Sequence, residues 1–152
     1  MISGFFDDHA QFVYNKALTF QYEHVVSEDD IRLALATISY NIAQCFHRRS
    51  QKEGEKSVLQ TLSFYNYCLS YLESSSKGMG CSNLIITSLN NIAQVYLDLC
   101  NFDMAHKVTD ALIAVVSRMM ALSYPVSFSE DEMPCIHLNA LTAQRYGSAP
   151  VA

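Results

Sequence analysis

Helix-breaking residues are scarce in this sequence. Its 152 residues include only five glycines and three prolines, and the first proline is Pro125. Proline is the residue least compatible with a helix interior, so no proline interrupts a helix before that position. Hydrophobic residues make up 50% of the chain, which argues against global disorder and suffices for one folded core. We therefore expect an all-α protein.

Charged residues are also sparse. They make up 16% of the chain, with a net charge of −5, and the ten Lys and Arg residues form no stripe. A nucleic-acid surface needs clustered cations, so we expect no nucleic-acid partner. No apolar run approaches the roughly 18 residues of a membrane span, and the start of the chain lacks the basic region of a secretory signal. The five cysteines are irregularly spaced, which favours reduced thiols and a cytoplasmic location.

Motifs for catalysis and metal binding are missing as well. Cys45 and His47 are two residues apart, and on a helix such residues point in nearly opposite directions, so they cannot hold one metal ion. Cys135 and His137 have the same spacing, without the further ligands that zinc requires. The chain contains no glycine-rich phosphate loop and no nucleophile or metalloprotease motif. We expect no enzyme activity, no cofactor and no metal site.

An internal repeat is the first positive signal. The tetrapeptide Asn-Ile-Ala-Gln occurs at 41–44 and again at 91–94, and an aromatic residue follows each copy two positions later. Thr37 and Thr87 also match at this separation of 50 residues. A repeat of this length is typical of proteins built from stacked helical units.

Helix signals around the two copies give two helix pairs, which we expect at 28–49 with 57–73 and at 82–100 with 103–122. Ser27 and Asp30 have the spacing of a capping box, and Asn101 is suited to cap the last helix. Residues 50–56 and 74–80 are expected to be loops. An unpaired helix at 7–24 would complete a domain over 1–123, and 124–152 is expected to be a mostly irregular tail, in which 136–141 could form a short ordered piece lying on the last helix. The apolar sides of the second helices contain Leu62, Tyr65, Cys68, Leu69 and Leu72, and Val108, Ala111, Leu112 and Val115.

The two helix pairs resemble tetratricopeptide (TPR) repeats in degenerate form. Ile42-Ala43 with Phe46, and Ile92-Ala93 with Tyr96, are similar to the signature of the first TPR helix. The copies depart from the family pattern in having alanine for the usual glycine, no closing proline and a longer first joint. The resemblance implies a short right-handed α-solenoid, that is, a scaffold or adaptor that binds protein partners.

The resemblance also implies where a partner binds. The first helix of each TPR pair lines a concave groove that holds a peptide or a partner helix. The groove positions would be Thr37, Tyr40, Asn41, Gln44, Arg48, Thr87, Asn90, Asn91, Gln94 and Asp98. A side-chain amide such as that of Asn41 or Asn91 both donates and accepts, so it can hydrogen-bond a peptide backbone whatever its sequence. The same amides could instead bond within the helix array.

Two further possibilities follow from this organisation. The chain could be a structural subunit whose groove is filled permanently by its own tail or by a neighbouring chain. The unpaired helix at 7–24 suggests either that upstream repeats are missing or that the chain self-associates, because each helical unit needs a neighbour to bury its apolar face.

Overall fold

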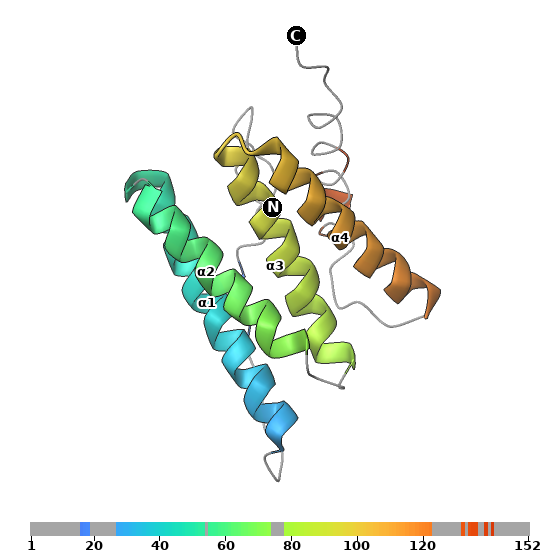
Figure 1. Cartoon of the computed structure of the whole chain (residues 1–152). Helices are drawn as coiled ribbons and strands as arrows, with labels where there is room; N and C mark the ends of the chain where they lie inside the picture. Colours follow the sequence, from blue (N-terminus) through green and yellow to red (C-terminus); the bar gives the residue numbers. More distant parts are fainter. Residues whose placement is uncertain are drawn as a thin grey trace, which may run out of the picture.

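Helices account for every regular element that the structure describes (Figure 1). The structure is a computed structural model that describes residues 16–18, 27–53, 55–73 and 78–122, together with 132, 134–136, 139 and 141. The four helices are α1 (Glu28–Glu53), α2 (Glu55–Glu73), α3 (Gly78–Asp98) and α4 (Phe102–Ala121). The expectation of an all-α protein is therefore confirmed for the described part of the chain.

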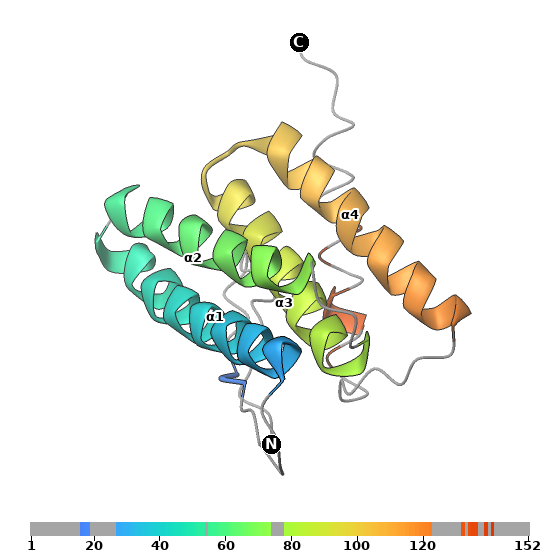
Figure 2. The same cartoon turned by 60° about the horizontal axis from the view of Figure 1, so that its bottom comes forward.

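Consecutive helices pack as adjacent pairs. Helix α1 lies along α2, and α3 lies along α4, each pair running antiparallel (Figures 1 and 2). Helix α3 also contacts both α1 and α2, so it joins the two pairs. Helix α1 lies at the edge of the array, where its helix contacts are with α2 and α3 (Figure 2).

Side-chain caps fix two helix starts where the sequence predicts them. Ser27 and Asp30 form the capping box of α1: the Ser27 backbone N–H donates to Asp30 Oδ2 at 2.9 Å, and the Asp30 N–H donates to Ser27 Oγ at 3.2 Å. Asn101 Oδ1 accepts from the Met104 N–H at 3.2 Å and caps α4. Each cap satisfies backbone donors that have no partner within the helix.

A Schellman motif ends α3. Cys100 has a φ of 54°, the left-handed conformation that usually belongs to glycine at this position. The Asn101 N–H donates to the Tyr96 carbonyl at 2.8 Å, and the Cys100 N–H donates to the Leu97 carbonyl at 2.9 Å. The tight reversal into α4 therefore rests on a non-glycine residue in a conformation that is unfavourable for it.

Some predicted boundaries are wrong. The expected loop at 50–56 is mostly helical, because α1 continues to Glu53 and α2 begins at Glu55. Residues 51–53 are Gln, Lys and Glu, which are all good helix formers, and Ser50 Oγ bonds back to the His47 carbonyl at 2.7 Å. Helix α3 begins at Gly78 rather than at 82, inside the second expected loop.

The predictions for the two ends of the chain are corrected in part. Residues 16–18, within the predicted helix 7–24, are not helical, and the remainder of that range lies outside the described residues. In the predicted irregular tail, the described residues 132, 134–136, 139 and 141 are helical, and the other tail positions lie outside the description. For the first result there was no local sequence signal, and the bonds between Leu18 and Asn41 account for it. For the second, a short ordered piece at 136–141 lying on the last helix was expected, and Ile136 packs with apolar residues of α4.

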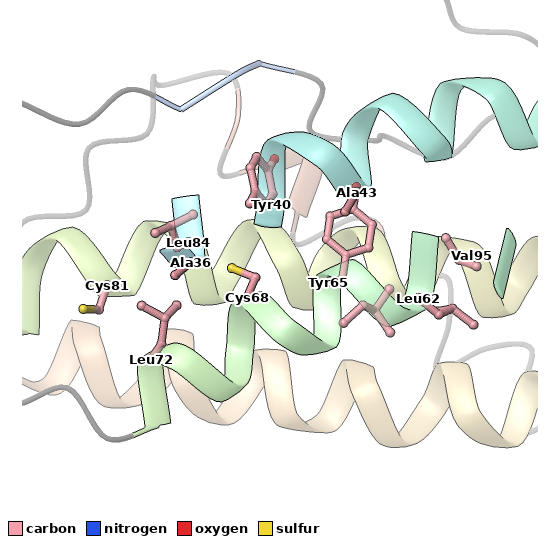
Figure 3. Close-up of a cluster of buried hydrophobic side chains, with 11 residues drawn as sticks. Ala36, Tyr40, Ala43, Leu62, Tyr65, Cys68, Leu72, Cys81, Leu84 and Val95 are labelled. Carbon is pink, nitrogen blue, oxygen red and sulfur yellow. The ribbon is translucent and has the colours of Figure 1, made fainter. Parts of the chain in front are cut away.

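The main core lies between α1, α2 and α3 (Figure 3). Tyr40 of α1 and Tyr65 of α2 are both fully buried, with ring centroids 5.8 Å apart. The predicted apolar side of α2 is confirmed, since Leu62, Cys68 and Leu72 are buried in the same cluster.

A second core cluster joins α3 to α4 and to the C-terminal segment. Ile136 is 1% exposed and packs with Ile86 of α3 and with apolar residues of α4. On α4 the predicted apolar face is partly wrong, because Ala111 is exposed whereas Leu112 is buried. The buried residues of α4 follow the spacing i, i+4, i+7, i+11 and i+14, and they are Ala105, Thr109, Leu112, Val116 and Met119.

Candidate functional site

The side chain of Asn41 binds the backbone of a segment that lies outside the four helices. Asn41 Oδ1 accepts from the Leu18 N–H at 3.0 Å, and Asn41 Nδ2 donates to the Leu18 carbonyl at 2.9 Å. Both backbone groups of one residue are thus paired by a single amide on α1. This pairing also explains why Leu18 is not helical, because its N–H and its carbonyl both bond to Asn41.

The C-terminal segment contacts α3 through a hydrogen bond between two side chains. Asn139 Nδ2 donates to Asn90 Oδ1 at 2.9 Å, and both residues are buried. Glu132, which is 8% exposed, pairs with the Lys16 ammonium. The segment that contains Leu18 and the segment that contains Asn139 therefore contact each other as well as the first helix of each pair.

A chain of buried polar contacts leads from Asn90 into the core. Asn90 Nδ2 donates to Asn91 Oδ1 at 3.1 Å, and Asn91 Nδ2 donates to the Tyr65 hydroxyl oxygen at 3.0 Å. His47 Nδ1 lies 3.2 Å from the same oxygen. The contacts connect Asn139 through α3 and α2 to α1, and such networks favour one arrangement of the helices because breaking a buried polar contact is costly.

Burial keeps the ionisable members of this network neutral. It lowers the pKa of His47 from 6.5 to about 4, so the imidazole is uncharged at neutral pH. Burial also raises the pKa of the Tyr65 hydroxyl, and the hydrogen bond from Asn91 opposes that rise only in part. His47 Nε2 is buried and has no hydrogen-bond partner among the residues that the structure describes. Neutral groups of this kind can position a backbone, but they cannot supply charge to a substrate.

The predicted groove residues divide into those that bond within the helices and those that reach other segments. Thr37 and Thr87 donate to helix carbonyls four residues earlier, each at 2.8 Å. Tyr40 is in the core and accepts from Gln44. Asn91 bonds inside the array, as the second interpretation of these amides allowed. Asn41 and Asn90 bond to the terminal segments.

The remaining three predicted residues lie at the ends of α1 and α3. Gln94 Nε2 donates to Asp98 Oδ1 at 2.7 Å. Burial raises the pKa of the Asp98 carboxyl, and the bond from Gln94 opposes the rise. Arg48 is exposed near the end of α1. The site centres on Asn41 and Asn90, whose side chains bond to Leu18 and to Asn139.

Sequence reasoning missed three members of this site. Leu18 was expected in a helix, and Asn139 was given no role. His47 was considered only as a metal ligand; it is buried, whereas Cys45 is exposed, so the two side chains lie on different sides of α1 as the helical spacing predicts. One sequence signal could have identified His47 as a member of the site. It falls on the apolar side of a predicted helix, and a polar side chain that is buried there must find hydrogen-bond partners.

Among the described residues, no group of three or more His, Cys, Asp or Glu side chains is placed to hold a metal ion. None of the helices in the described ranges is long and apolar enough to cross a bilayer.

Comparison with known proteins gives no relative. No protein-family model matches the chain, and the searches of curated proteins and of solved structures found no match either. The function is therefore inferred from the contacts described above.

Proposed function

We propose that the chain is a protein-interaction module of the TPR-like kind, in which the first helices of two pairs, α1 and α3, form a face that binds a segment of polypeptide. The adjacent antiparallel pairs and the repeated Asn-Ile-Ala-Gln sequence support this proposal. A right-handed solenoid is the arrangement we expect the pairs to adopt. The proposed role is that of an adaptor or scaffold, without catalysis or a cofactor.

The observation that carries the proposal is the pairing of Asn41 with both backbone groups of Leu18, at 3.0 and 2.9 Å. Both hydrogen bonds go to backbone atoms of Leu18, so the amide would accept the backbone of any residue there except proline, which has no N–H. Each such hydrogen bond contributes about 0.5–1.5 kcal/mol. Affinity for a particular partner must then come from side-chain contacts around this fixed point.

In this structure the face is occupied by the chain's own segments. A partner that binds there must displace Leu18 from Asn41, and it competes with a segment tethered at high effective concentration. Release of that segment would therefore increase the affinity for a partner.

One observation favours a structural subunit as the second candidate function. Asn139 and Glu132 are buried, and Asn139 bonds to the network that reaches Tyr65 in the core. A segment held in this way could fill the face permanently, and no partner would then exchange with it.

The two functions are distinguished by releasing the N-terminal segment in the full chain. Lys16→Glu places a carboxylate beside the buried Glu132, and the repulsion should free the N-terminal segment. The probe is a fluorescein-labelled peptide of residues 12–22, which retains Lys16 and Leu18, and binding is measured by fluorescence anisotropy. The interaction-module proposal predicts tighter binding to Lys16→Glu than to the natural chain.

A second substitution tests the role of Asn41. Adding Asn41→Ala to Lys16→Glu removes two hydrogen bonds and should weaken peptide binding by about 5- to 150-fold. The matched control is Asn66→Ala, because Asn66 is an exposed asparagine on α2, and it should leave affinity unchanged. If Lys16→Glu remains folded by circular dichroism and binds no peptide, the interaction module is wrong and the structural subunit is supported.

A further inference from the structure

Helix α1 has apolar residues on two opposite faces. One face contributes Ala36, Tyr40 and Ala43 to the core. On the other, Ile31 is 49% exposed, Leu35 is 40% exposed and Ile38 is 55% exposed. A helix that is apolar on both sides is typical of one buried on both sides, yet no described helix covers this outer face.

The outer residues follow the spacing of a coiled-coil seam. From Ile31 the steps alternate between four and three residues through Leu35, Ile38 and Ile42 to Cys45. Ile42 is half-buried and Cys45 is exposed. Seven-residue spacing of this kind keeps one stripe of a helix against one stripe of another. We call these five residues the outer stripe.

Charge at the two ends of the stripe indicates what covers it. The same spacing continues to Glu28 at the start of α1 and to Arg49 near its end. Glu28 also pairs with Arg32 of the same helix at 2.6 Å, and Asp29 and Asp30 keep the start of α1 negative overall. Arg48 adds positive charge near the end. A copy of α1 packed antiparallel would bring the acidic end beside the basic end, whereas a parallel copy would oppose like charges at both ends.

We propose that the outer stripe is a homodimer interface, in which α1 of a second copy packs antiparallel about a two-fold axis near Ile38. Ile31 then lies opposite Cys45 of the second copy, and Leu35 lies opposite Ile42. Such an interface is self-complementary, because each contact away from the axis occurs twice and Ile38 meets Ile38 of the second copy at the axis. Asn41 is not part of the stripe, so this proposal does not rest on the proposed function.

Sedimentation equilibrium of the full chain tests the interface. Concentrations from about 1 to 100 µM cover dissociation constants in the micromolar range. The expected species has twice the 17.1 kDa mass of the chain. Ile38→Lys places two ammonium groups at the axis and should raise the dimer dissociation constant at least about 30-fold. The matched control is Leu59→Lys, because Leu59 is 59% exposed on α2, and that variant should remain dimeric.

Two results would overturn the interface. A natural chain that stays monomeric across the range shows that no second copy covers the stripe. Equal dissociation constants for the natural chain and Ile38→Lys place the dimer contact elsewhere. Circular dichroism of each variant excludes unfolding as the cause of a lost dimer.

Charge reversal tests the orientation. Arg49→Glu alone should weaken the dimer, because it opposes Glu28 of the second copy with a like charge. Adding Glu28→Lys should restore most of the affinity in an antiparallel dimer, since the end charges again attract. No restoration by the double variant, in a chain that remains helical, would contradict the antiparallel arrangement.

Disulfide cross-linking gives an independent measure of orientation. In a background of Cys100→Ser and Cys135→Ser, Ile31→Cys should form a cross-linked dimer with Cys45 under mild oxidation. Removing that thiol by Cys45→Ser should abolish the product. A product that persists without Cys45 would join position 31 to itself and would show a parallel dimer instead.

Discussion

The buried imidazole of His47 should make the stability of the fold depend on pH. Burial lowers its pKa from 6.5 to about 4 in the folded chain, so the unfolded chain binds the proton more readily between those two values. Stability therefore falls as pH decreases through this window, and the effect is complete below about pH 4. Above pH 6.5 the imidazole is neutral in both states and the effect disappears.

The pKa difference gives the size of the effect. A change from 6.5 to about 4 corresponds to about 3 kcal/mol when the window has been crossed completely. Between pH 7 and pH 4.5, where the folded chain is only partly protonated, the expected loss is about 2 kcal/mol. This is a large fraction of the 5–15 kcal/mol or so that is typical of a small domain.

The assay compares the natural chain with His47→Asn, which keeps a polar side chain without a titrating group. Urea unfolding followed by circular dichroism gives the unfolding free energy of both at pH 7 and pH 4.5. Carboxyl groups, including that of Asp98, titrate in both proteins and cancel in the comparison. The natural chain should lose about 2 kcal/mol more than His47→Asn over this interval. An equal loss in both would refute the assignment of His47 as a buried neutral group.

Three further outcomes can be checked on single residues. Cys100→Gly should stabilise the chain by about 0.5–1 kcal/mol in urea unfolding, because glycine adopts the φ of 54° at Cys100 without strain; no gain would contradict the strain. Tyr65→Phe should cost about 1–3 kcal/mol, because it removes the oxygen that accepts from Asn91, and an unchanged unfolding free energy would show that this bond contributes nothing net. Burial raises the pKa of the Cys68 thiol to about 11, so iodoacetamide at pH 8 should modify Cys68 in urea and leave it intact in the folded chain, as peptide mass spectrometry can show.

The helices and their pairing could be predicted from local signals because most of these signals are strong here. Before Pro125 no proline interrupts the helices, and the caps at Ser27 and Asn101 each fix a start within one residue. The joint between α1 and α2 was predicted to be a loop over 50–56, but it is much shorter. The glycine and the charged residues that suggested a loop are also compatible with the end of one helix and the start of the next. The helix propensity of residues 51–53 and the bond from Ser50 to the His47 carbonyl favour the longer helix.

For the site, the sequence indicated only the kind of contact that Asn41 makes. The donor and acceptor of Asn41 suggested backbone recognition, and the structure places a backbone there. The occupant was not predictable, because the spacing around Leu18 favours a helix and nothing local indicates that α1 binds it. Asn91 has the same sequence context as Asn41 but bonds to Tyr65, 26 residues away. Only the packing of α2 against α3 determines that difference.

The contacts of Asn41 and Asn90 together define what a competing partner must offer. Displacing Leu18 requires a backbone N–H and carbonyl in the same place, which any extended peptide supplies. Displacing Asn139 removes the donor at 2.9 Å from Asn90 Oδ1, and a buried bond lost without replacement costs about 1–3 kcal/mol. A partner that covers both helices therefore needs a second donor, such as an amide side chain, at a fixed distance from the backbone that Asn41 holds. A peptide that reaches Asn41 alone avoids this cost, and it would displace the N-terminal segment while Asn139 stays in place.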